Sequence, residues 1–245
     1  MILSVEQWAL VGALVLAAGT LPSVYYLLND RDNQLYYGIL AAITGIAAAS
    51  YTLTALGIGT IPVDGATFYA PRYVDWLLTT PLLILYMALL CKPGKKLYGL
   101  LIGLDVALIL FGVAAIFTEG ALSLALFAAG CVAYLALAYL LVVDLPAKGS
   151  FATERAAIVF SKLRNVTVVL WTMYPVVWLL APVGFDFLLP STEMLVIVYL
   201  DIITKVGFAI LALMGRDALN PLADDPLAMD VDGEEVSTAE PAVAD

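Results

Sequence analysis

Histidine is absent from this chain of 245 residues, and only two cysteines occur. Both, Cys91 and Cys131, lie within apolar runs, where a free thiol behaves as a small hydrophobic side chain. Without histidine or closely spaced cysteines, the common zinc-binding patterns are excluded. No nucleotide-binding or hydrolytic motif occurs, so we expect neither an enzyme nor a partner of nucleic acid.

Charged residues are also scarce. They make up 13% of the chain, whereas soluble domains average about 25%. Hydrophobic residues make up 63%, and the mean hydropathy is +0.99. This composition predicts an integral membrane protein surrounded by lipid. No basic stretch precedes the first apolar run, so we expect that run to be a true first helix rather than a cleaved signal.

The net charge of −10 is concentrated near the C-terminus. From about residue 220 the chain is rich in Asp, Glu, Ala and Pro and has no aromatic side chain. Such a segment buries too little apolar surface to offset the entropy lost on ordering. We therefore expect a membrane domain over residues 1–217 and an acidic, disordered, cytoplasmic tail over 218–245.

Seven apolar runs are long enough to cross a bilayer, which takes roughly 20 helical residues. They cover approximately residues 4–28, 34–57, 71–91, 95–117, 121–143, 154–181 and 190–216. Each span must satisfy its own backbone hydrogen bonds in lipid, so each is expected to be a helix. The second connection, residues 60–70, contains a Val-Asp-Gly-Ala turn pattern that predicts a short β-hairpin. The fold class is therefore an all-α bundle of seven transmembrane helices with a hairpin between the second and third.

Basic residues near the ends of the spans predict the orientation of the bundle. One side collects Arg31, Lys92, Lys95, Lys96, Lys148, Arg155, Lys162, Arg164 and Arg216. The other side has only Arg72, which we expect to be buried. The chain is thus predicted to be a multi-pass protein of the cell membrane, with an extracellular N-terminus and a cytoplasmic C-terminus.

A few charged residues lie deep within the spans, where ionisable groups are costly and usually functional. Lys205 lies near the middle of the seventh span, and Asp201 lies one turn before it on the same face. Arg72 and Asp75 share a face of the third span. The two carboxylates could hold the buried ammonium, with Arg72 balancing the second negative charge. A buried ion-pair network that only fixes helix packing is the alternative, but buried pairs stabilise proteins poorly.

A buried lysine is also the group that forms a Schiff base with a carbonyl. Aromatic residues at helical spacing could form the wall of a pocket beside it: Trp171, Tyr174, Trp178 and, from the third span, Trp76. Together with small residues such as Gly130, these rings could enclose a flat, elongated, apolar ligand.

Three segments carry a resemblance to a known family. Residues 72–81 (RYVDWLLTTP), 171–178 (WTMYPVVW) and 201–207 (DIITKVG) resemble the third, sixth and seventh helices of archaeal microbial rhodopsins. The three motifs occur in the family's order, each on the expected span, and the resemblance covers nearly the whole chain except the tail.

The resemblance implies all-trans retinal in Schiff-base linkage to Lys205. It implies Asp75 as primary counterion and proton acceptor, with Asp201 and Arg72 completing the counterion complex. Light would isomerise the retinal, and the Schiff base would then give its proton to Asp75. The residues that the resemblance assigns to the retinal pocket are Trp76, Thr80, Leu83, Leu108, Phe127, Gly130, Trp171, Tyr174, Pro175, Trp178 and Thr204.

Three positions favour a sensor of the sensory rhodopsin II kind over a proton pump. Pumps of the family carry an acid where this chain has Tyr86, and a phenol, with an ordinary pKa of about 10, is a poor proton donor. Thr204 stands where pumps usually have alanine, and sensory relatives pair this threonine with the equivalent of Tyr174. Tyr199 lies about 240° around the helix from Lys205, where sensory relatives meet a two-helix membrane transducer. Thr204 could also bond back to its own helix, and Tyr199 could simply face lipid.

Other features leave alternatives open. Asp105 matches an acid found in pumps and in some sensors, and Glu193 matches one acid of the pumps' proton-release pair, whose second member is missing near Val183. A slow outward proton pump therefore remains the close alternative, and a retinal-free membrane protein is a distant one. A chloride pump is disfavoured because its counterion position carries threonine rather than Asp75. Assembly with copies of itself is left open.

Overall fold

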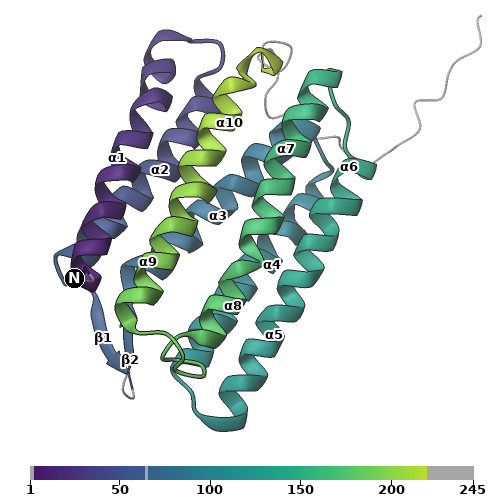
Figure 1. Cartoon of the computed structure of the whole chain (residues 1–245). Helices are drawn as coiled ribbons and strands as arrows, with labels where there is room; N and C mark the ends of the chain where they lie inside the picture. The colour runs from purple at the N-terminus through teal and green to yellow at the C-terminus, as the bar shows by residue number, and fades with distance from the viewer. Residues whose placement is uncertain (1–2, 64–65, 220–245) are drawn as a thin grey trace, which may run out of the picture.

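The structure, a computed structural model, describes residues 3–63 and 66–219. It is a bundle of seven long helices standing side by side (Figure 1). Each helix is long and apolar enough to cross a membrane, which confirms the predicted seven-helix all-α fold. The first four spans are continuous helices: α1 (Val5–Asn29), α2 (Gln34–Ala55), α3 (Ala70–Cys91) and α4 (Lys95–Ile116).

The last three spans are helical but irregular. The fifth consists of α5 (Gly120–Tyr139), a π-helical turn (Leu140–Asp144) and α6 (Leu145–Lys148). The sixth is divided into α7 (Glu154–Trp171) and α8 (Met173–Leu180). The seventh consists of α9 (Pro190–Asp201), a π-helical turn (Ile202–Gly207) and α10 (Phe208–Met214), followed by a short 3-10 turn (Arg216–Ala218).

Two of these irregularities differ from the sequence prediction, and both involve proline. The fifth span was expected to end near residue 143, yet it continues through Pro146, because the wide π turn before it relieves the clash between the proline ring and the preceding turn. The sixth span was expected to be unbroken. Pro175 cannot donate a backbone hydrogen bond to the carbonyl of Trp171, and the helix is interrupted at Thr172.

A two-stranded antiparallel sheet joins α2 to α3, as predicted. Strand β1 (Thr60–Val63) pairs with β2 (Ala66–Tyr69), with Thr60 opposite Tyr69 and Val63 opposite Ala66. The two predicted turn residues between the strands lie outside the described residues. The hairpin projects from the end of the bundle where α1 begins (Figure 1), which we call the hairpin end, and the opposite end is the far end.

The helices form a closed bundle because α1 packs against both α2 and α9. The largest apolar cluster fills the far half of the bundle, between α2, α3, α7 and α10. It includes Ala218 and Leu219, which were expected to begin the tail but are buried. The rest of the predicted tail, residues 220–245, lies outside the described residues.

Candidate functional site

Lys205 lies in the middle of the bundle, in the π-helical turn of the seventh span, and is only 1% exposed. Its ammonium nitrogen forms an ion pair with Asp75 Oδ2 and lies 3.6 Å from Asp201 Oδ2. The sequence did not predict the π turn. Such turns are frequent at functional sites because they redirect side chains and release backbone groups from regular pairing.

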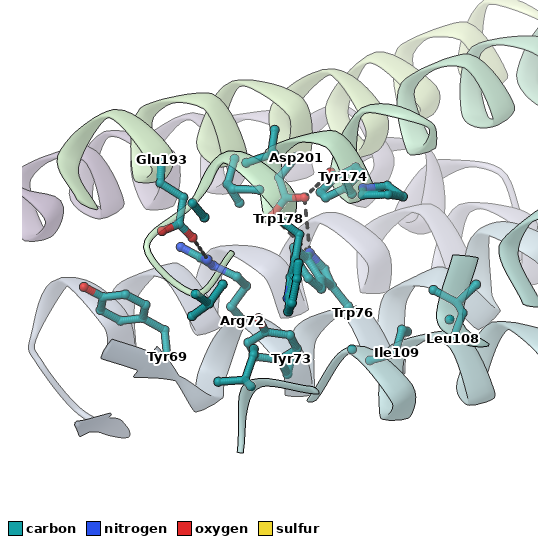
Figure 2. Close-up of a pocket in the computed structure, with 18 of the residues that line it drawn as sticks. Tyr69, Arg72, Tyr73, Trp76, Leu108, Ile109, Tyr174, Trp178, Glu193 and Asp201 are labelled. Carbon is teal, nitrogen blue, oxygen red and sulfur yellow. Dashed lines mark hydrogen bonds and ion pairs between the residues drawn. The ribbon is translucent and has the colours of Figure 1, made fainter. Parts of the chain in front are cut away.

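Three side chains from different helices orient Asp201. Tyr51 on α2 donates a hydrogen bond to Asp201 Oδ2 at 2.7 Å, and Tyr174 on α8 donates one to Oδ1 at 2.5 Å. Trp76 Nε1 on α3 lies 3.3 Å from Oδ1. Figure 2 shows Tyr174 and Trp76 approaching this carboxylate from different elements. Asp201 is thus fixed as a charged, hydrogen-bonded group beside the lysine.

Asp75 is held differently from Asp201. Its Oδ2 pairs with Lys205, while its Oδ1 is buried and has no hydrogen-bond partner among the described residues. Thr79, one turn later, bonds the backbone carbonyl of Asp75 rather than its carboxylate. Of the two carboxylates at the lysine, Asp75 therefore has an oxygen free to take a proton.

Arg72 points away from Asp201 and toward Glu193, at the hairpin end (Figure 2). Among the described residues, its ion pair is with Glu193, at 2.8 Å between Nη1 and Oε1. Its guanidinium also lies over the ring of Tyr69 and contacts the sulfur of Met194. We expected Arg72 to balance the second negative charge beside Lys205. Here Glu193 takes the direct contact, so the arginine forms a second charged layer nearer the hairpin end.

A cavity of about 190 Å³ opens beside Lys205. Its walls include every residue that the sequence predicted for the pocket: Trp76, Thr80, Leu83, Leu108, Phe127, Gly130, Trp171, Tyr174, Pro175, Trp178, Thr204 and Lys205 itself. Arg72 and Asp201 also line it.

Aromatic rings shape this cavity. Trp76 and Tyr174 meet edge to face near the lysine, and Phe127 and Trp178 stack at 4.3 Å farther along. Gly130 lies where α5 faces α4, and a Cβ there would make an ordinary contact with the carbonyl oxygen of Leu108 at 3.4 Å. The space suits a flat, apolar molecule with a carbonyl at the end that reaches the amine.

The sequence analysis missed two residues of the site, Tyr51 beside Asp201 and Tyr134 on the cavity wall. Tyr51 is a tyrosine within an alanine-rich part of the second span, a polar group at membrane depth that could have signalled a partner. Tyr134 on α5 lines the cavity, and its hydroxyl lies 2.7 Å from that of Thr172, at the break in the sixth span. Neither residue belongs to the three motifs of residues 72–81, 171–178 and 201–207, which is why both were missed.

The far side of Lys205 is apolar. Tyr86 is fully buried, with its ring against Tyr36 and Phe208, and its hydroxyl has no hydrogen-bond partner among the described residues. The buried carboxylates of the described chain are Asp75, Asp201 and Asp105. Asp105 accepts a hydrogen bond from Thr80 at 2.7 Å, on the wall of the cavity. No described acid is buried in the apolar cluster around Tyr86.

Thr204 and Tyr199 are the two positions that the sequence analysis connected with signalling. The Thr204 hydroxyl is 3.4 Å from that of Tyr174, a longer contact than the bond from Tyr174 to Asp201. Thr204 also bonds the backbone carbonyl of Asp201. Tyr199 is 63% exposed on the outer surface of α9 and does not line the cavity.

Comparisons with sequence families, individual relatives and solved structures all point to the same family. Residues 4–219 match the sequence profile of the family described as bacteriorhodopsin-like protein. The chain is 41% identical to sensory rhodopsin-2 of Halobacterium salinarum, covering 98% of each chain, and 39% identical to sensory rhodopsin-2 of Natronomonas pharaonis, covering 96% of each. Among solved structures, thermophilic rhodopsin from Rubrobacter xylanophilus matches with a TM-score of 0.85 at 36% identity, over 90% of this chain and 100% of that one.

Proposed function

This chain belongs to the bacteriorhodopsin-like family, and from that premise we propose that it is a light sensor that binds all-trans retinal at Lys205 and signals to a membrane transducer. Membership of a rhodopsin family implies a retinal chromophore. The observation that carries the proposal is the buried amine at one end of an aromatic cavity, paired with two carboxylates.

The cavity fits retinal in shape and chemistry. Retinal is elongated and apolar and carries one aldehyde, which matches an apolar cavity with one amine. When bound, it supplies visible absorption and a light-driven change of shape. Lys205 holds it covalently, while Trp76, Trp171, Tyr174 and Trp178 exclude water and restrict its position.

The charged groups set the path of the proton. In the dark, Asp75 and Asp201 stabilise a positive charge at Lys205 Nζ. A change in the position of Nζ relative to these partners would weaken that stabilisation, and Asp75, the carboxylate in direct contact with Nζ, would accept the proton. Asp201 is held in place by three hydrogen-bond donors.

A sensor is favoured over a pump by the environment of Tyr86. A buried phenol in an apolar cluster is a poor proton donor to Lys205, so the dark state returns slowly. Slow return gives a transducer time to respond but limits the turnover of a pump. The relatives named sensory rhodopsin-2 support the same choice. A slow outward proton pump is the second candidate, and Glu193 favours it, since this carboxylate lies at the hairpin end of the Lys205 cavity, where a proton passed on from Asp75 would leave.

The far end is proposed to be cytoplasmic, because the basic residues at the ends of the spans gather there. Arg155 at the start of α7 pairs with Asp217 after α10 at 3.0 Å. A tilt of the sixth helix would strain this link and change the surface formed by the two helices. The exposed Tyr199 on α9 is the proposed contact with a two-helix transducer, and the rest of the outer surface meets lipid.

Proton transport by purified protein in lipid vesicles tests the choice between sensor and pump. With retinal added, we expect a visible band that Lys205→Ala abolishes. Under continuous light, we expect the vesicle pH to change far less per absorbed photon than with a bacteriorhodopsin control. Efficient, sustained acidification or alkalinisation would favour the pump. Absence of a visible band in the unmodified protein would reject both.

A further inference from the structure

A second cavity, of about 330 Å³, lies at the hairpin end. It is enclosed by the hairpin, the ends of α4 and α8, the start of α5, and the loop after α8. We call it the vestibule. Its inner wall includes the apolar residues Ala115, Ile116 and Leu179 and the part-buried Ser123, while its rim carries Thr118, Glu119 and Leu124. Glu119 is exposed, so the rim faces the membrane surface.

The vestibule adjoins the cavity at Lys205. Five residues line both spaces: Ala66, Ile116, Trp178, Pro182 and Val183. Trp178, which stacks on Phe127, therefore has the Lys205 cavity on one side and the vestibule on the other. The indole nitrogen of Trp178 makes no hydrogen bond to described residues, so no polar contact holds this ring in place.

The Lys205 cavity extends along α4 toward the vestibule. Asp105, Leu108, Ile109, Gly112 and Ile116 line it from one face of that helix. Eleven residues of helical rise correspond to about 16 Å, so the cavity runs from the level of Asp105 to the end of α4 at the hairpin. In the other direction Tyr86, Met87, Leu90 and Phe208 are fully buried and close the far half of the bundle.

We propose that the vestibule is the port through which retinal is loaded into the retinal-free protein. This inference rests on the proposed function. The aldehyde must reach Lys205 first, and a molecule entering from the vestibule arrives in that orientation without turning inside the bundle. The apolar inner wall solvates the polyene, and the polar rim keeps the port at the membrane surface.

The loop after α8 forms the inner gate of this port. Residues 181–189 fold back on the last turn of α8, with Phe185 donating a backbone hydrogen bond to Leu179 at 2.8 Å. Gly184 approaches the same turn so closely that a Cβ would lie 2.5 Å from the carbonyl oxygen of Leu179. Pro182 and Val183, which line both cavities, precede this tight turn, so the position of the loop sets the width of the passage beside Trp178.

A reversible plug in the vestibule tests the port. Ser123 lines the vestibule and not the Lys205 cavity, so Ser123→Cys places a thiol in the port alone. The retinal-free variant is labelled with a bulky disulfide-forming reagent, all-trans retinal is added, and growth of the visible band is timed. We expect the label to slow loading at least about tenfold, which corresponds to about 1.4 kcal/mol of added barrier. Removing the label with a reducing agent should restore the rate and leave the final absorption maximum unchanged.

Two controls separate the port from other effects. Unmodified protein treated with the reagent reports any labelling of Cys131, which lines the Lys205 cavity. Val132→Cys carries the same label on the same helix at a position 66% exposed on the outer surface, and should load at the normal rate. Ser123→Trp provides a permanent plug if the label reacts poorly.

Loading at the normal rate in both plugged Ser123 variants would overturn the proposal and indicate that retinal passes between helices directly from the lipid. The port and the proposed function can fail separately. In Lys205→Ala, retinal entry is followed by quenching of tryptophan fluorescence, since three tryptophans line the cavity. If quenching occurs at the same rate with and without the plug, the port is wrong even where the chromophore assignment holds.

Discussion

The two halves of the bundle on either side of Lys205 contrast in polarity. Toward the hairpin end lie Asp75, the Arg72–Glu193 pair and Asp201, which accepts hydrogen bonds from two tyrosines and a tryptophan. Toward the far end the described residues form a dense apolar cluster around Tyr86. A proton leaving Lys205 therefore finds acceptors on one side only, and a proton returning from the other side must cross an apolar barrier. The contrast explains how one fold can release a proton readily and recover it slowly.

Removing the acceptor of the polar half should have the largest effect. In Asp75→Asn the amide cannot take a proton or balance the charge on Lys205, so light-driven proton transfer from Nζ should be lost. The visible maximum should shift, and the band should no longer respond to acid as in the unmodified protein. Absorption spectra across a pH series and flash spectroscopy measure both effects. An unchanged maximum and an unchanged acid titration would show that Asp75 is not the counterion.

Adding an acid to the apolar half should have the next largest effect. Tyr86→Asp places a carboxylic acid where Tyr86 now has an unpaired hydroxyl, and an internal proton donor typically accelerates transfer by about 10²-fold or more. Recovery of the visible band after a flash should accelerate accordingly. Asp105→Asn is the control: it changes a buried acid on the cavity wall without adding a proton donor near Tyr86, and it should not accelerate recovery. No acceleration in Tyr86→Asp would mean that the barrier lies at another position.

Removing one hydroxyl group from the polar half should have a moderate effect. Tyr174→Phe removes the 2.5 Å hydrogen bond to Asp201 and leaves that buried carboxylate short of one donor. Losing one partner of a buried charged group costs about 1–3 kcal/mol. We expect a lower melting temperature and a shifted visible maximum, measured by thermal bleaching and absorption spectroscopy. Tyr51→Phe, which removes a 2.7 Å bond to the same carboxylate, should behave similarly.

Tyr86→Phe should have the smallest effect. Its hydroxyl has no partner among the described residues, so removing it leaves no other group unsatisfied. The change in stability should stay within about 1 kcal/mol, and recovery should remain slow. Measuring the thermal bleaching of Tyr86→Phe and Tyr174→Phe side by side compares the stability cost of losing a hydroxyl group in each half. Equal destabilisation in the two variants would contradict the contrast in polarity.

The sequence predicted the seven helices and most of the residues that surround Lys205. In lipid, a long apolar run satisfies its own backbone hydrogen bonds only as a helix. Charged residues at membrane depth are rare enough to indicate the functional site. The motif around Asp75, the aromatic run on the sixth span and the motif around Lys205 were each placed on the correct element. The predicted pocket residues indeed line one cavity.

What the sequence could not predict depends on contacts between distant segments. The pairing of Arg72 with Glu193 joins residues 121 positions apart, and the bond from Tyr51 to Asp201 spans 150. The π turn at Lys205 results from how the seventh helix packs, since no proline or glycine pattern marks where it begins. The vestibule is lined by three separate segments of the chain and has no motif of its own.

The most direct test of the account is the rate at which the visible band recovers after a flash, measured with and without azide, a small proton carrier. If the apolar half lacks a proton donor, recovery should take on the order of hundreds of milliseconds or longer, and azide should accelerate it. Recovery within a few milliseconds that is insensitive to azide would contradict the account, because a group within the protein would then be returning the proton to Lys205.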